Sequence, residues 1–197
     1  MATEPLPGAL DAEDDAYEND SSLGDDDTHS ITTSLSSNIM RVRGENGRTY
    51  HSYKEGKYLF PNDEPENDRL DLQHHLFQLT FSGALFTAPI PKGKTLHRVL
   101  DVGTGTGIWA IDFADEHPES QVFGIDLSPI QPAMVPPNVT FQVDDLEEPW
   151  TFTQKFDFIY SRMMCGAFAD FDNFFRQSFE CVHYPSLKPL FLFVYLW

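Results

Sequence analysis

Short apolar runs alternate with segments of helical periodicity in the second half of the chain. Four runs predict strands, at 98–102 (RVLDV), 121–126 (QVFGID), 138–143 (NVTFQV) and 155–160 (KFDFIY). A helix is expected after the first run, ending near Asp115, and another over 170–181, where phenylalanines recur on one side. This alternation is typical of a mainly parallel α/β sheet.

Two further segments complete the pattern. The link 127–137 (LSPIQPAMVPP) holds four prolines, so it must be irregular or carry only a short helical turn. A helix is expected to begin at Asp68 as its N-cap, because apolar residues after it recur near one face. His74 and His75 in this helix are adjacent and point to different faces, so we interpret them as surface or satisfied histidines rather than a chelating pair.

Composition divides the chain into four parts. Its 197 residues carry a formal net charge of −18, and residues 1–40 hold ten Asp or Glu without any Lys or Arg. We expect 1–40 to be a disordered acidic and Ser/Thr-rich tail, because it lacks the apolar groups that would offset its ordering entropy. The remaining parts are a cover segment and helix at 41–97, a nucleotide-binding half at 98–180 and a divergent end at 181–197.

The charge and cysteine content narrow the classes of partner. An acidic chain disfavours direct nucleic-acid binding, which Lys and Arg drive. No stretch reaches the ~20 apolar residues that a membrane span needs, so no membrane is expected. Two cysteines are too few for a disulfide framework, and no cluster has metal-ligand spacing. We expect a cytoplasmic or nuclear protein, with protein partners as an open alternative for the acidic tail.

The glycine turn after the first strand is the main chemical signal. Gly103, Gly105 and Gly107 stand at every second position, and Asp101 lies two residues before the first of them. A dinucleotide site uses G-x-G-x-x-G and places pyrophosphate on free backbone N–H groups. An acid beside such a turn would repel pyrophosphate, so D-x-G-x-G-x-G favours a cationic, phosphate-free nucleoside such as S-adenosylmethionine.

Acids also end the next two strands. Asp126 closes the second strand, 25 residues after Asp101, where a carboxylate accepts bonds from ribose hydroxyls. Asp144 and Asp145 close the third strand, and either could accept from an adenine amino group. Each acid alone could be a loop cap, but ligands of open α/β sheets bind at the strands' carboxyl edge, where all of them are expected.

These motifs resemble those of class I S-adenosylmethionine-dependent methyltransferases. The stretches LDVGTGTGIWAIDFA, VFGIDLSPIQP and FQVDDLEEPW match the first three family motifs, and DLSPIQPAMVPPNV and FDFIYSRMM resemble the fungal LaeA-like methyltransferases, which include secondary-metabolism regulators. The resemblance implies a Rossmann-like sheet whose 58–75 segment covers the cofactor. The cofactor-binding residues that it implies, together with the glycine turn, are Asp101, Gly103, Gly105, Gly107, Asp126, Leu127, Asp144, Asp145, Leu146, Ser161 and Arg162.

The resemblance ends after Glu180. The family pattern leads there into a Pro-Gly-Gly turn and a fifth strand, whereas this chain continues with CVHYPSLKPLFLFVYLW. We therefore expect four or five of the seven strands of a class I sheet, in a truncated chain, with LFLFVYL standing in for the fifth.

The expected function is S-adenosylmethionine-dependent methyl transfer to an unknown acceptor, in a candidate regulator of secondary metabolism. A truncated, non-catalytic fragment that binds cofactor or protein is the alternative, and a NAD-dependent oxidoreductase is disfavoured by the glycine spacing and Asp101. No residue is assigned a catalytic role, and no metal is expected.

Overall fold

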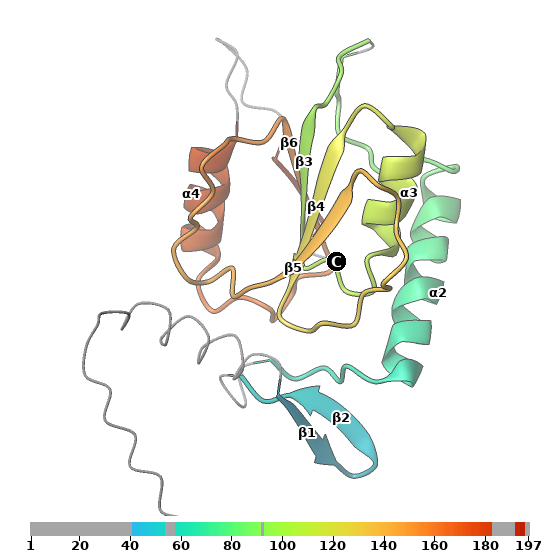
Figure 1. Cartoon of the computed structure of the whole chain (residues 1–197), viewed down its shortest axis with the longest axis vertical. Helices are drawn as coiled ribbons and strands as arrows, with labels where there is room; N and C mark the ends of the chain where they lie inside the picture. Colours follow the sequence, from blue (N-terminus) through green and yellow to red (C-terminus); the bar gives the residue numbers. More distant parts are fainter. Residues whose placement is uncertain (1–40, 54–57, 92, 183–191, 196–197) are drawn as a thin grey trace, which may run out of the picture.

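The computed structural model describes residues 41–53, 58–91, 93–182 and 192–195. The expected acidic tail at 1–40 lies outside the described residues. Within them, every strand and helix that the apolar pattern predicts is present. Their arrangement is shown in Figure 1.

A five-stranded parallel sheet forms the centre, in the order β5-β4-β3-β6-β7. Its strands are β3 (Arg98–Val102), β4 (Gln121–Asp126), β5 (Val139–Val143), β6 (Phe158–Arg162) and β7 (Leu192–Tyr195). The register sets Leu100 of β3 between Phe123 of β4 and Ile159 of β6. The chain runs outward from β3 to β5 and returns to the other side of β3 at β6. The carboxyl ends of β3 and β6 therefore flank the point where the strand order reverses, which is where open α/β sheets bind ligands.

Helices cover both faces of the sheet (Figure 1). Helix α3 (Ile108–Glu116) packs on one face, with α2 (Glu64–Thr80) outside it, and α4 (Phe171–Cys181) covers the other. On the α3 side, the Trp109 indole stacks on Tyr160 with ring centroids 3.8 Å apart, and Phe113 continues the aromatic layer. On the α4 side, Phe174 and Phe156 are fully buried with Leu100. The sheet residues thus alternate between two separate cores.

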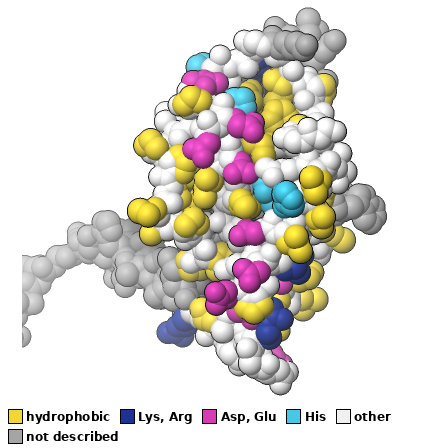
Figure 2. Space-filling model, turned by 90° about the vertical axis from the view of Figure 1, so that its right-hand side faces the viewer, with side chains coloured by type: hydrophobic (Ala, Val, Ile, Leu, Met, Phe, Trp, Pro, Cys, Tyr) yellow, Lys and Arg dark blue, Asp and Glu magenta, His cyan; other side chains and the backbone are white. Residues whose placement is uncertain are grey.

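The outer surface of α2 is unusual for a helix on a folded domain. Leu72, Leu76 and Leu79 are all more than half exposed, although they lie on one helical face at spacings of four and three. Figure 2 shows this side of the molecule, where hydrophobic and acidic side chains are interspersed. The buried side of α2 is polar instead, because His74 and Glu66 face inward.

Two element boundaries differ from the sequence-based expectation. Helix α2 begins at Glu64, so the prediction of Asp68 as its N-cap was wrong: Asp63 caps the helix, accepting from the Glu66 amide at 3.1 Å, and a proline occupies the first turn. Strand β6 covers Phe158–Arg162 rather than 155–160. It therefore includes Ser161 and Arg162, which had been expected just beyond the strand.

The remaining boundaries agree with expectation within one or two residues. Strand β5 begins at Val139, α3 ends at Glu116, and α4 begins at Phe171 after its N-cap Asp170. The link between β4 and β5 contains no helix. The apolar run near the chain's end supplies β7, which pairs in parallel with β6.

A two-stranded antiparallel hairpin precedes the sheet domain. It consists of β1 (Val42–Glu45) and β2 (Arg48–His51), joined by Asn46 and Gly47, which both have positive φ. The hairpin lies beyond the N-terminal end of α2 in Figure 1. It brings His51, at the end of β2, close to the carboxyl edge of the large sheet.

Candidate functional site

The turn between β3 and α3 is tight and internally bonded. Gly103, Gly105 and Gly107 have φ values of 70°, 57° and 82°. The amides of Gly103 and Thr104 donate to one carbonyl of β4, at 2.9 and 3.0 Å. The Gly107 amide donates to the Thr104 carbonyl at 2.9 Å, and the Gly105 amide to the Asp126 carboxylate at 2.8 Å. Four amides of this turn therefore already have acceptors inside the protein.

Gly107 has a packing role. A Cβ on Gly107 would overlap the ring of Phe141, which projects from β5 over the turn. Its φ of 82° also favours glycine. Gly107 is buried and does not line the cavity described next, so its contribution to a ligand site is to shape the turn.

A cavity of about 400 Å³ opens at the carboxyl ends of β3, β4, β5 and β6. This volume suits a ligand of drug or nucleoside size. Most of the residues predicted from the sequence line it: Gly103, Gly105, Asp126, Leu127, Asp144, Asp145, Leu146 and Arg162. Three predicted residues do not line it. They are Gly107, Asp101, which lines a smaller neighbouring cavity, and Ser161, whose side chain is wholly buried within β6.

Asp126 is held in place by backbone amides. Its Oδ2 accepts from the Gly105 amide at 2.8 Å, and its Oδ1 accepts from the Ser128 amide at 3.0 Å. Burial raises the pKa of Asp126, and these two hydrogen bonds oppose that rise. Each carboxylate oxygen keeps a further acceptor site. The side chain can therefore accept two hydroxyl donors from a ligand without losing its own anchors.

Asp144 and Asp145 differ in their surroundings. Asp145 is buried, and its Oδ1 accepts from the Glu147 amide at 3.0 Å. Asp144 is exposed, and its Oδ1 accepts from the Asp145 amide at 2.8 Å. Both line the cavity. Asp145 is therefore the more sheltered acceptor of the two. Asp144 helps to hold it by accepting from its backbone amide.

Asp101 lies at the end of the cleft where β3 meets β6. It is 3% exposed and lines a small cavity of about 60 Å³ with Gly103, Thr104 and Arg162. Burial raises the pKa of Asp101 to about 7, while the hydrogen bond from the Thr104 hydroxyl at 2.6 Å and the charge of Arg162 oppose the rise. With this pKa, the carboxyl is divided between its charged and neutral forms at neutral pH.

The site also contains residues that the motifs did not indicate. His51, only 5% exposed, lines the cavity with Tyr58, and their ring centroids are 5.5 Å apart. Burial lowers the pKa of His51 and raises that of Tyr58, and the charge of Asp126 acts on both. The sequence analysis predicted a cover segment and helix over 41–97, but it indicated none of these individual contacts.

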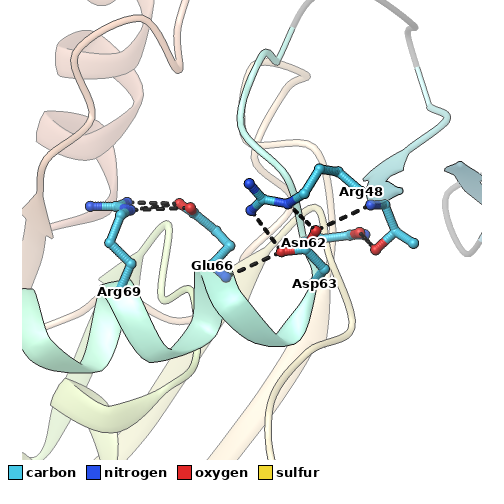
Figure 3. A network of polar contacts seen from close by, with 6 residues as sticks. Arg48, Asn62, Asp63, Glu66 and Arg69 are labelled. Atoms are coloured by element: carbon cyan, nitrogen blue, oxygen red, sulfur yellow. Dashed lines mark hydrogen bonds and ion pairs between the residues drawn. The ribbon is translucent and has the colours of Figure 1, made fainter. Parts of the chain in front are cut away.

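An ionic network ties the hairpin to α2 (Figure 3). The Arg48 guanidinium binds both carboxylate oxygens of Asp63, with Nη2 to Oδ1 at 2.8 Å. Asp63 is at the same time the cap of α2, and this pairing lowers its pKa to about 2. One turn later, Glu66 accepts from Arg69, with Nη2 to Oε1 at 2.7 Å, and Arg69 lines the cavity. The hairpin, the helix start and the cavity wall are thus connected.

Neither a metal-binding cluster nor a membrane-spanning helix is present among the described residues. No group of three or more His, Cys, Asp or Glu could hold a metal ion there. No helix of the described segments is long and apolar enough to cross a bilayer. Cys165, exposed at the cavity rim, and Cys181 are free thiols.

Comparisons with known proteins agree with the geometry. The profile of a family described as a methyltransferase domain matches residues 72–187. Methyltransferase pytC of Aspergillus terreus is 47% identical over 83% of this chain and 48% of its own length. The secondary metabolism regulator laeA of Aspergillus fumigatus is 46% identical over 74% of this chain and 38% of its own length.

Two further similarities concern another LaeA protein and a solved structure. A protein-methionine methyltransferase laeA of Emericella nidulans is 45% identical over 68% of this chain and 36% of its own length. The solved structure of the plantazolicin methyltransferase BpumL with SAH aligns at 19% identity and a TM-score of 0.41, over 61% of this chain and 45% of that chain. The chain spans about half the length of the curated relatives that it matches, or less.

Proposed function

Since this chain belongs to the methyltransferase-domain family, we propose that it binds S-adenosylmethionine in the cavity at the carboxyl edge of its sheet and serves methyl transfer. Within the family it is similar to the fungal LaeA-like methyltransferases. The cofactor, the reaction and the roles of the individual residues are all part of this proposal.

The observation that carries the proposal is how the glycine turn uses its amides. A dinucleotide or triphosphate site offers free backbone N–H groups to phosphate oxygens. Here the amides of Gly103, Thr104, Gly105 and Gly107 are bonded to protein acceptors. Carboxylates line the cavity instead, so the site suits a ligand with hydroxyl and amino donors and positive charge. S-adenosylmethionine has these groups and no phosphate.

Each wall of the cavity has a proposed task. Asp126 would accept from the ribose hydroxyls, since both of its oxygens keep free acceptor sites. Asp145 would accept from the adenine amino group, with Leu127 and Leu146 as apolar walls beside the base. Asp101 would face the cationic end of the ligand, where its charged form becomes favourable.

When bound, the cofactor supplies an electrophilic methyl group and its own leaving group. The residues of this chain then bind, orient and shelter the reactants rather than create a nucleophile. The hairpin contributes to the shelter, because His51 at its end lines the cavity and is itself almost fully buried. No residue is assigned the role of a general base.

The proposal is tested by calorimetry of the purified chain with S-adenosylmethionine and, separately, with NAD. We expect saturable binding of the first and none of the second. Binding of NAD in preference to S-adenosylmethionine would overturn the assignment and favour a nicotinamide oxidoreductase.

Transfer itself needs a separate assay. One relative carries the name protein-methionine methyltransferase, so a pool of methionine-containing peptides is the first acceptor to supply. We expect release of S-adenosylhomocysteine in proportion to peptide methylation. Binding without any turnover would support the second candidate, a unit that binds cofactor or partner without catalysis. A role in regulating secondary metabolism is proposed from the names of the relatives alone, and residence in the cytoplasm or nucleus stays a prediction from the sequence.

A further inference from the structure

Arg162 occupies a central place at the junction of the two cavities. It ends β6 and lines both the large cavity and the small one that contains Asp101. Its guanidinium lies over the ring of Phe77, 4.6 Å from the centroid. Its Nη2 donates to Nδ1 of His74 at 3.0 Å. A guanidinium has five N–H donors, so several remain for a ligand.

His74 is held from its other side. Its Nε2 lies 2.9 Å from Oδ2 of Asp112 on α3, and the Gln78 side-chain amide donates to the same oxygen at 2.9 Å. Since arginine can only donate, Nδ1 of His74 must accept, and the ring proton then sits on Nε2 and points to Asp112. The His74 side chain is 2% exposed, so this arrangement is sheltered from water.

We infer that Asp112 and His74 position the Arg162 guanidinium to receive the carboxylate of the ligand's amino-acid end, beside Asp101. This inference rests on the proposed function and adds a subsite to it. Two opposite charges, Asp101 and Arg162, line one small cavity. That pair is complementary to a zwitterion, because an ammonium can face the carboxyl and a carboxylate can bind the guanidinium in a bidentate manner. His74 and Asp112 are positioning residues that act through Arg162.

The contacts of His74 with Arg162 and Asp112 involve two residues that the cofactor-binding motifs do not include. His74 comes from α2 and Asp112 from the middle of α3, so neither belongs to the glycine turn. A buried polar histidine is costly unless its nitrogens are bonded, and here both are. An arginine side chain loses considerable rotamer freedom when it is fixed. Holding it before the ligand arrives lowers the entropy lost on binding.

Two ligands that differ only in the amino-acid end test the inference. S-adenosylhomocysteine carries the ammonium and carboxylate, whereas 5′-deoxy-5′-methylthioadenosine has the same nucleoside thioether without them. Calorimetry with Arg162→Met should show affinity for S-adenosylhomocysteine reduced roughly ten- to hundredfold, the scale of charge-assisted hydrogen bonds. The affinity of this variant for methylthioadenosine should stay within about twofold of the wild-type affinity. Such retained binding would also show that the variant folds.

Substitutions at His74 separate positioning from simple packing. His74→Phe keeps a buried ring but removes the acceptor, so we expect it to weaken S-adenosylhomocysteine binding and spare methylthioadenosine. His74→Asn places an amide oxygen near the Nδ1 position and should restore much of the loss. His75→Phe makes the same substitution at the adjacent, exposed histidine, and it should leave the affinity for both ligands unchanged.

The outcomes distinguish this inference from the proposed function. If the wild type binds neither nucleoside, the proposed function and this inference are both overturned. If it binds both ligands and the Arg162 and His74 variants weaken them equally, or weaken neither, the subsite is overturned while the cofactor site stands. A selective loss for S-adenosylhomocysteine, with rescue by His74→Asn, supports the inference.

Discussion

Proton release at Asp101 gives a quantitative prediction of how the site responds to a cationic ligand. Burial holds the pKa of this carboxyl at about 7 in the ligand-free protein. An ammonium or sulfonium beside it favours the charged form, so binding should drive its deprotonation. The perturbation to apply is therefore a change of pH across the pKa, in the wild type and in Asp101→Asn.

The size of the effect follows from the fraction of Asp101 that is ionised before binding. With a pKa of about 7, roughly one molecule in eleven is ionised at pH 6 and about half at pH 7. Apparent affinity scales with the population of the binding-competent form. It should therefore rise about fivefold from pH 6 to pH 7, and binding at pH 7 should release about half a proton.

Isothermal titration with S-adenosylmethionine in two buffers of different ionisation enthalpy measures both quantities. The ligand's amino group, an α-amine with a pKa of about 7.7–8.0, stays mostly protonated over this range. Burial lowers the pKa of His51, which favours the neutral form of its ring. Asp101→Asn should bind more weakly at pH 7 and lose both the slope and the proton release.

Two results would contradict this reasoning. A wild-type affinity that is flat between pH 6 and 7 would show that Asp101 does not meet the cationic end of the ligand. A slope that persists in Asp101→Asn would assign the proton to another group, with Asp126 as the first candidate because its pKa is also raised by burial.

Further predictions concern stability and the other anchors. Asp101→Asn should raise the free energy of unfolding at pH 8 by roughly 4 kcal/mol, because the folded-state pKa of about 7 lies about three units above the unfolded pKa. The protonated carboxyl stabilises the fold below the unfolded pKa, and this contribution is lost as the pH rises to about 7, so chemical denaturation at pH 5 and 8 checks it. Asp126→Ala should weaken S-adenosylmethionine binding by ~1–3 kcal/mol in the same titrations, and unchanged affinity would remove the ribose assignment. Gly107→Ala should destabilise by about 2–5 kcal/mol, from positive φ plus overlap with the ring above it, whereas Gly83→Ala, at a similar φ in open space, should cost only about 1–2 kcal/mol. Asp63→Asn should lower the melting temperature at pH 5, and since the pKa of Asp63 is about 2, its difference from wild type should shrink as pH falls towards that value; a constant difference would argue that the Arg48 pair contributes nothing.

The sequence predicted those parts of the fold that depend on local pattern. Strand β3, the glycine turn and α3 follow one another without interruption, so periodicity and turn chemistry locate them within a residue or so. The parallel alternation then implied where Asp126 and Asp145 would end their strands, and both line the cavity. These are properties of short segments, which a single chain displays directly.

The parts that were missed depend on contacts between distant segments. The start of α2 is fixed by Asp63, whose second partner, Arg48, is fifteen residues away in a separate hairpin. His51 reaches the cavity only because that hairpin docks near α2. The role of His74 was correctly read as a satisfied histidine, but its partners, 38 and 88 residues away, could not be inferred from spacing.

The double role of Asp63 has a consequence for how the hairpin is attached to the sheet domain. One carboxylate ends α2 and also holds the hairpin that carries His51. The amide of Glu66 donates to both the side chain and the main-chain carbonyl of Asp63, so the first turn of the helix keeps its acceptors whether or not Arg48 is paired. The helix start is therefore secured by its own residues, and the Arg48 pair fastens the hairpin to a helix end that is already capped.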